Sequence, residues 1–570
     1  MRAPASLHWV GRTRYRRVPP AALTRPMAQY DYIVIGAGSA GCALASRLSD
    51  AGACRVLLLE AGGSDRSPWI QIPIGYGRTF NDPRYNWMYQ SEPDPALGNR
   101  RQFVPRGKVL GGSSSINAMV YVRGQPGDFD DWAAAGNPGW AWRDLLPYFR
   151  KLEDHPGGVS QYHGVGGPVH VSDVSAQVHP LCGLFLQACD SLGIMRTPDF
   201  NGAQPEGSGL WEVTIKDGVR VSASNAYLKP ARSRRNLEVL TRAQATRVLF
   251  EGKRATGVEF LRGGARHSAQ AHREVIVAAG AINSPQLLEL SGVGQAPLLR
   301  RLAIPLVTDS PAVGQGLQDH LAVSYFYRSK VPTLNNQLAP FLGKVRAALT
   351  YVLAGRRGPL SMSVNQAGAF LHSRAGLARP NMHTYFNPAS YSTTTVGASR
   401  RLMNPDPYPG FLMSFNTCRP TSRGSVHIRS ADPLESPAIT LNSLSTDADL
   451  QDVPEGARLL RRIAASEPLA SIIESEREPG SAVHSEQEAL EDFRKRAGSV
   501  FHDCGTCAMG PDPRRAVVDA RLRVHGVTCL RVADASIFPN LTSGNTNAAV
   551  IMVGEKAADL ILQDSDAPQA

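Results

Sequence analysis

Three glycines near the start of the chain, Gly36, Gly38 and Gly41, have the spacing of a G-x-G-x-x-G loop. In such loops the first glycine makes the turn, the second lets a pyrophosphate approach the backbone, and the third lets the following helix pack closely. An acid, Glu60, follows at about the 20-residue distance at which a carboxylate reaches ribose hydroxyls. This spacing indicates the binding of a nucleotide cofactor, although a glycine triplet alone also occurs in ordinary loops.

A second group of reactive side chains lies in VFHDCGTCAMG, residues 500–510. The imidazole of His502 suits proton transfer near neutral pH, although a single histidine after an apolar stretch is also a common core residue. Cys504 and Cys507 form a C-x-x-C pair of the kind found in zinc and thiol redox sites. We interpret them as packing residues, because neither a second cysteine pair at ligand spacing nor a thioredoxin-like helix follows. No metal site is expected.

The elements that must position the glycines are visible on either side of them. Residues 32–35 are a β-branched apolar run that predicts a strand, and an apolar face begins at Leu44 in the helix that follows. Residues 55–59 predict a second buried strand, which ends at Glu60. Strand, glycine turn, helix and strand together predict an α/β fold with a Rossmann-like nucleotide-binding domain.

Further segments supply strands and helix starts along the chain. Residues 236–252 predict two short strands, and residues 273–280 predict another buried strand. Ser284 is expected to cap the next helix with Pro285 in its first position, and Ser291 to end it. Near the C-terminus, residues 530–533 predict a strand and residues 543–547 begin a long apolar helix, whose positive end favours an anionic group.

The net charge of +12 is concentrated at one end. Residues 1–27 contain six arginines and no acid, so the rest of the chain has an ordinary balance, and nucleic acid is not an expected partner. We interpret this leader as lying upstream of the working protein, which would begin at Met27; an Arg-rich mitochondrial transit peptide is the alternative. Eight scattered cysteines favour a reducing compartment, and no apolar run is long enough for a membrane span.

The motifs GAGSAG and, about 70 residues later, RGKVLGGSSSIN resemble those of the glucose-methanol-choline oxidoreductases, FAD enzymes that oxidise alcohols. The resemblance extends from Tyr30 to Leu562 and includes GAINSPQLLELSGVG. It implies a discontinuous FAD-binding domain over residues 28–170, 205–325 and 500–564. An inserted α+β substrate domain, built on an antiparallel sheet that would include residues 411–415 and 424–428, would take residues 171–204 and 326–499.

The resemblance also implies which residues hold FAD. Some members of the family attach FAD covalently through a histidine that Ile116 replaces here, so noncovalent FAD is expected. The expected cofactor-binding residues are Gly36, Gly38, Ser39, Gly41, Glu60, Ala61, Trp87, Arg106, Val109, Gly111, Gly112, Ser113, Asn117, Ala118, Met119, Val120, Ala245, Gly280, Asp534, Ala535 and Asn547.

His502 matches the family's catalytic base, and Asn545 matches its hydrogen-bonding partner. The expected reaction is oxidation of a primary alcohol, with a quinone, a dye-like carrier or oxygen as electron acceptor. Gln366 stands where choline-specific sequences are expected to have an acid, which argues against a cationic substrate. The alternatives are a flavin-containing hydroxynitrile lyase and a catalytically silent flavin-binding module.

Residues 341–354 and 447–465 predict helices in the inserted domain. The first is amphipathic, with Lys344 and Arg346 opposite an apolar face that includes Leu342 and Val352. We expect this face to pack on the core, with docking on a membrane surface as the alternative. The expected location is the cytoplasm, with peripheral attachment to the inner membrane as a variant.

Overall fold

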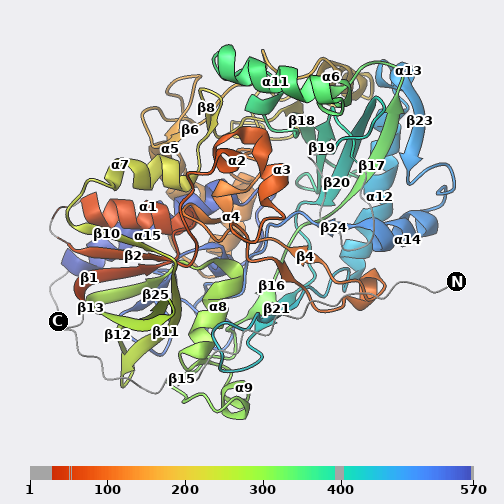
Figure 1. Ribbon diagram of the computed structural model, residues 1–570. Coiled ribbons are helices and arrows are strands. Elements are labelled where there is room, and N and C mark those ends of the chain that lie inside the picture. Colours follow the sequence, from red (N-terminus) through yellow and green to blue (C-terminus); the bar gives the residue numbers. More distant parts are fainter. Residues whose placement is uncertain (1–27, 51, 53, 392–403, 567–570) are drawn as a thin grey trace, which may run out of the picture.

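The computed structural model describes residues 28–50, 52, 54–391 and 404–566 of the 570-residue chain. The basic leader expected over residues 1–27 lies outside these residues. Figure 1 shows two lobes, each built on a seven-stranded sheet. The chain passes between the lobes several times, because strands from early, middle and late parts of the sequence occur in both sheets.

The first sheet carries the glycine loop. Its strand order is β10-β2-β1-β13-β12-β11, with β25 parallel beside β13, and the first four strands are mutually parallel. All five residues of β2 are buried, as expected for an apolar strand inside a parallel sheet. The strands are β1 (Ala28–Ile35), β2 (Val56–Glu60), β10 (Leu237–Thr241), β11 (Ala243–Glu251), β12 (Arg254–Arg262), β13 (Ala265–Val277) and β25 (Leu530–Val532).

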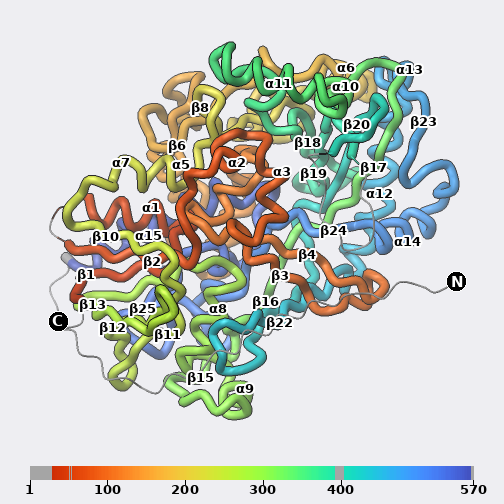
Figure 2. Tube along the Cα trace, in the orientation of Figure 1, coloured from red at the N-terminus to blue at the C-terminus, as the bar shows by residue number. Residues whose placement is uncertain are grey.

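The two ends of the described chain meet on this sheet. Helix α1 (Ser39–Asp50) packs against α15 (Asn547–Asp566), and Figure 2 shows these N-terminal and C-terminal segments side by side. An ion pair joins Arg47 to the fully buried Glu555, with 2.8 Å between Nη2 and Oε1. At the start of the two helices Ser39 Oγ donates to Asn547 Oδ1 at 2.7 Å. Both helix N-termini are therefore held at one point.

The expected start of the helix after β13 is wrong. Helix α8 spans Gly280–Leu290, so Ser284 and Pro285 lie inside it rather than at its cap. The backbone N–H of Gly280 donates to Asp534 Oδ2 at 2.8 Å, and Ser284 Oγ donates to the same oxygen at 2.6 Å. A carboxylate from the end of β25 satisfies the helix start, so no local cap is needed. The helix ends before Ser291, as predicted.

The second sheet is antiparallel and has the order β23-β17-β20-β19-β18-β7, with β24 beside β17. Helices α6 (Leu181–Ser191), α12 (Asp447–Ala464) and α14 (Glu486–Arg496) share its hydrophobic core. Strand β7 belongs to this sheet although it lies within residues 205–325, expected in the cofactor domain. The strands are β7 (Gly207–Leu210), β17 (Leu321–Ser329), β18 (Ala367–Leu371), β19 (Met382–Asn387), β20 (Gly410–Thr417), β23 (Ile473–Glu478) and β24 (Gly498–Ser499).

The strand expected over residues 424–428 forms, but it is not part of this antiparallel sheet. β21 (Gly424–His427) pairs with β16 (Gln315–Leu317) and β22 (Ala438–Thr440) in a separate sheet. Glu289 of α8 draws it toward the first lobe by accepting from the backbone N–H of Ile428 at 2.8 Å. A long-range contact of this kind leaves no trace in the local pattern of residues 424–428.

The helix expected over residues 341–354 also forms, as α11 (Phe341–Leu353), but its apolar face does not pack on a core. Leu342 and Val352 keep 78% and 72% of their surface exposed, whereas Ala347 and Tyr351 are the buried positions. The helix therefore rests on small or amphipathic side chains and leaves its most apolar side in solvent. None of the helices in the described part of the chain is long and apolar enough to cross a bilayer.

Candidate active site

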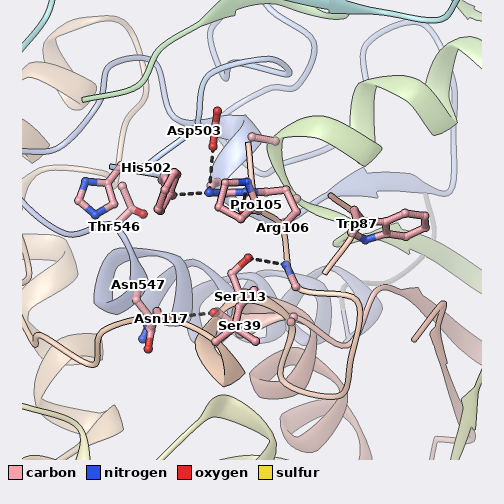
Figure 3. Close-up of a pocket in the computed structure, with 18 of the residues that line it drawn as sticks. Ser39, Trp87, Pro105, Arg106, Ser113, Asn117, His502, Asp503, Thr546 and Asn547 are labelled. Atoms are coloured by element: carbon pink, nitrogen blue, oxygen red, sulfur yellow. Dashed lines mark hydrogen bonds and ion pairs between the residues drawn. The ribbon is translucent and has the colours of Figure 1, made fainter. Parts of the chain in front are cut away.

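A long cavity opens between the two lobes and gathers most of the predicted site residues. Its wall comes from the turn after β1, the segment 103–120, the start of α8, strands β19 and β20, and residues 500–503 and 534–550. Figure 3 shows His502, Arg106 and Asn547 converging on it. The predicted residues that line it are Gly36, Gly38, Ser39, Glu60, Ala61, Trp87, Arg106, Gly112, Ser113, Asn117, Ala118, Met119, Val120, Ala245, Gly280, His502, Asp534, Ala535, Asn545 and Asn547.

Three predicted residues lie behind this wall and shape it. A Cβ on Gly41 would lie 1.9 Å from the carbonyl oxygen of Gly36, so only glycine lets α1 come this close to the turn. Gly111, at φ +86°, donates its N–H to the carbonyl of Ala37 at 2.8 Å. Val109 is buried and pairs with Gly63 in a short bridge. These residues position the loop that faces the cavity.

The turn after β1 fits a dinucleotide. A Cβ on Gly38 would meet no protein atom closer than 4.0 Å, so this backbone is open on the cavity side. Glu60, at the other end of the turn, accepts from the backbone N–H groups of Ala37 at 3.0 Å and Gly62 at 2.7 Å. Burial raises the pKa of Glu60 to about 7. An open glycine, a helix N-terminus and a buried acid are the features that hold a pyrophosphate and a ribose.

His502 also lines the cavity and is 8% exposed. Its Nδ1 is 2.9 Å from Nδ1 of His320, whose Nε2 is 2.9 Å from the carbonyl oxygen of Cys418. Because a carbonyl only accepts, His320 carries its proton on Nε2 and its Nδ1 accepts from His502. His502 therefore carries its own proton on Nδ1, which leaves Nε2 unprotonated, as a hydrogen-bond acceptor.

Asn545 completes the pair that was predicted from sequence. Its Nδ2 lies 3.2 Å from Nε2 of His502, and its Oδ1 accepts from the hydroxyl of Tyr385 at 3.3 Å. An amide donor thus stands beside an imidazole acceptor at one point of the cavity wall. A hydroxyl group, which both donates and accepts, complements such a pair.

Burial keeps this imidazole pair uncharged. It lowers the pKa of His502 well below its ordinary value, and the neighbouring His320, His383 and Arg106 lower it further. Burial likewise lowers the pKa of His320 to about 4. Both rings are consequently neutral at neutral pH, the state in which His502 can accept a proton.

The backbone around His502 is tied down by charged groups. Arg106 forms an ion pair with the fully buried Asp503, with 2.9 Å between Nη2 and Oδ2, and also donates to the carbonyl of Phe501. The backbone N–H of His502 donates to Asp319 Oδ1 at 2.7 Å. Burial and the charge of Asp503 raise the pKa of Asp319 well above its ordinary value. These contacts hold the main chain while His320 holds the ring.

Cys504 and Cys507 lie in the core of the first lobe. Both side chains are fully buried as free thiols, and burial raises the pKa of each well above its ordinary value. A thiol in this state is a poor nucleophile and a poor metal ligand, since both roles require the thiolate. The geometry agrees with the interpretation of the C-x-x-C pair as packing.

Four polar residues of this site were not predicted from sequence. His320 closes the segment GQGLQDH, which has no catalytic pattern of its own, and Tyr385 lies within β19 without a motif around it. His320 reaches His502 because β17, which follows it, pairs with β24, and Tyr385 reaches Asn545 from β19 in the second sheet. The asparagines of the cavity wall, Asn365 and Asn387, were missed for the same reason.

Models of the GMC oxidoreductase family match residues 30–322 and 420–554. The chain belongs to the GMC oxidoreductase family. It is 44% identical over 555 residues to the mitochondrial choline dehydrogenase of Mus musculus, covering 95% of this chain and 91% of that protein.

The fold of this chain is also similar to that of solved oxidoreductase structures. The pyridoxine 4-oxidase from Mesorbium loti is 32% identical with a TM-score of 0.83, covering 93% of this chain and 98% of that one. An FAD-dependent oxidoreductase from Chaetomium thermophilum is 26% identical with a TM-score of 0.84, covering 94% and 99%.

Membership of the GMC family decides the class of activity. The protein is an FAD-dependent oxidoreductase that acts on CH–OH groups. The resemblance, the Rossmann-like domain and the antiparallel second sheet predicted from sequence are confirmed. A hydroxynitrile lyase or a silent binding module is not favoured, since the most similar relatives include choline dehydrogenases.

Proposed function

We propose that this enzyme oxidises a small uncharged primary alcohol to the aldehyde, with His502 as the base that takes the hydroxyl proton. The observation that carries the proposal is the unprotonated Nε2 of His502, which accepts from the Asn545 amide at 3.2 Å. The substrate oxygen accepts from Asn545 Nδ2 while its proton passes to His502 Nε2. FAD, held along the glycine turn and the segment 106–120, supplies the acceptor for the hydride that leaves the same carbon.

The charge of the cavity wall bears on the substrate. The polar side chains that the second lobe contributes to this wall are uncharged: Ser324, Asn365, Tyr385, Asn387 and Ser414. Among the described residues that line it, the carboxylates are all engaged: Glu60 accepts from backbone amides, Asp503 pairs with Arg106, and Asp534 caps α8. No carboxylate of this described wall is left to neutralise a cationic substrate.

Gln366 stands where an acid is expected in choline-specific sequences, and it does not supply a negative charge for a cationic substrate. It is buried, its Oε1 accepts from the backbone N–H of His179 at 2.8 Å, and its Nε2 donates to the carbonyl of Ser363 at 3.3 Å. The side chain is therefore used to join two segments of the second lobe. This arrangement supports an uncharged substrate.

Choline and its neutral carbon isostere, dimethylbutanol, test this directly because they have the same shape and differ only in charge. We expect kcat/KM for the isostere to equal or exceed that for choline, since a quaternary ammonium would lose hydration here without gaining a counter-ion. Steady-state kinetics with a dye acceptor measures both. A preference of about 100-fold or more for choline, equivalent to about 2.7 kcal/mol, would contradict the proposed substrate class.

We also propose that FAD is bound noncovalently. Ile116, which stands where some family members have the linking histidine, lines the cavity as a buried side chain without a nucleophilic atom. Acid precipitation of the purified protein should leave all the yellow colour in the supernatant. Colour that stays on the denatured pellet would show a covalent bond through another residue.

His320 is proposed as the residue that sets the tautomer of His502. His320→Ala removes the acceptor for the Nδ1 proton, and we expect kcat/KM to fall by roughly 10- to 100-fold while FAD stays bound. Because His320 helps to lower the pKa of His502, the acidic limb of the pH profile should move to higher pH. His320→Asn places an amide oxygen near the position of Nδ1 and should recover much of the loss. If kcat/KM falls equally in both variants and the pH profile does not shift, His320 acts only in packing and does not set the tautomer of His502.

A further inference from the structure

Helix α11 carries more exposed large hydrophobic side chains than any other element in the described part of the chain. Of the eleven large hydrophobic side chains exposed there, six belong to this single helix of 13 residues. They are Phe341, Leu342, Val345, Leu349, Val352 and Leu353, with exposed fractions between 40% and 78%. Scattered exposed hydrophobic residues are normal, but a contiguous group of this kind marks a contact surface.

The spacing of these residues places them on one side of the helix. At about 100° per residue, the six side chains fall within roughly 120° of the helix circumference. Ala347 and Tyr351, which anchor the helix, lie on the opposite side, and the Tyr351 hydroxyl donates to the carbonyl of Gly218 at 2.8 Å. Figure 1 shows α11 at the outer edge of the molecule. The apolar side is thus presented outward by a helix that is itself firmly held.

Basic residues flank the apolar stripe. On the same circumference Lys344 falls beside one edge and Arg346 beside the other, and Arg356 and Arg357 follow the helix; all four are exposed. From His320 to Pro405 the sequence contains no Asp or Glu at all. The helix and the residues that directly flank it therefore carry basic but no acidic side chains, so α11 itself is cationic as well as apolar.

We propose that the exposed side of α11 docks on a membrane surface that carries anionic lipids. Its apolar stripe would enter the boundary between headgroups and acyl chains, while the flanking Lys and Arg side chains would contact the phosphates. At about 20 Å a helix of 13 residues is shorter than the hydrocarbon core, so it would lie along the surface rather than cross it. A second copy of the chain is a poorer partner, since it would bring the two sets of basic side chains together.

Binding to vesicles tests the proposal with the full-length, FAD-loaded protein. In a sedimentation assay, the protein should bind vesicles of phosphatidylcholine mixed with phosphatidylglycerol. Its affinity for them should be about tenfold or more above its affinity for vesicles of phosphatidylcholine alone. Added salt should weaken the binding. The double variant Leu342→Glu/Val352→Glu should lose it by about tenfold or more. Its turnover of alcohol in solution should be unchanged, because neither side chain lines the cavity.

Leu306→Glu is the matched control. Leu306 is 45% exposed and precedes β15 (Thr308–Asp309), at the end of the molecule away from α11 in Figure 1. This variant should bind vesicles like the original protein. Absence of binding to anionic vesicles, or equal binding by the α11 variant, would overturn the proposal. A dimer in solution that the α11 variant dissociates would also overturn it, by assigning the surface to self-association.

Discussion

Replacing His502 by alanine should lower kcat/KM by roughly 10² to 10⁴, the usual contribution of a positioned general base. The reason is local: in the described structure Nε2 of His502 is the unprotonated nitrogen that accepts from Asn545, and the tautomer of His502 is set by His320 and Cys418. FAD content should be retained, because the substitution leaves the glycine turn and the segment 106–120 unchanged. Raising the pH should restore part of the rate, since more of the alcohol is then ionised without help from the enzyme.

Two further variants serve as controls for His502→Ala. Asn545→Ala removes a donor but leaves the base, so its loss of kcat/KM should be clearly smaller. Cys504→Ser alters a buried thiol in the same segment and should leave the FAD-loaded enzyme close to its original activity. Near-normal turnover in FAD-loaded His502→Ala would remove His502 from the mechanism. An inactive but FAD-loaded Cys504→Ser would point to thiol chemistry instead.

Replacing Gly38 by valine should yield a folded protein that binds FAD about 10- to 100-fold more weakly, the result of forcing extra carbons into space that the cofactor needs. A Cβ at this position meets no protein atom closer than 4.0 Å and Gly38 lines the cavity, so the new side chain would occupy the binding space rather than disturb the core. Titration of the apoprotein with FAD measures the affinity. Circular dichroism and the melting temperature report on the fold.

Gly41→Ala is the matched comparison, because it adds a single carbon to the same loop. That Cβ would lie 1.9 Å from the carbonyl oxygen of Gly36, so backbone must move and the melting temperature should fall. The two substitutions in one motif should therefore have different effects: Gly38→Val should weaken FAD binding, and Gly41→Ala should destabilise the fold. FAD binding of original strength by Gly38→Val would show that the turn does not hold the pyrophosphate.

The cofactor half of the molecule was predictable from sequence because its signals are local. The turn at Gly36 and Gly38, the strands beside it and the acid Glu60 lie within one short stretch, where spacing alone constrains the geometry. His502 and Asn545 required the family resemblance, since neither has a distinctive local pattern. The structure brings their side chains together at 3.2 Å.

What the sequence did not show depends on contacts between distant segments. The start of α8 is moved by Asp534, a residue 250 positions from Ser284 along the chain. His320 reaches His502 across 182 positions, and its role depends on the carbonyl of Cys418, which no side-chain pattern can reveal. The exposed side of α11 was expected to be buried because periodicity shows that a face is apolar but not what lies against it.

The most direct test of the account is anaerobic mixing of the FAD-loaded enzyme with a panel of small primary alcohols, followed through the visible absorbance of the bound flavin. We expect the colour to bleach rapidly with at least one uncharged alcohol in the original enzyme. In His502→Ala the bleaching should be slower by roughly 10² to 10⁴, with the same flavin content. A flavin that stays fully oxidised with every alcohol, or that bleaches equally fast in both proteins, would contradict alcohol oxidation with His502 as the base.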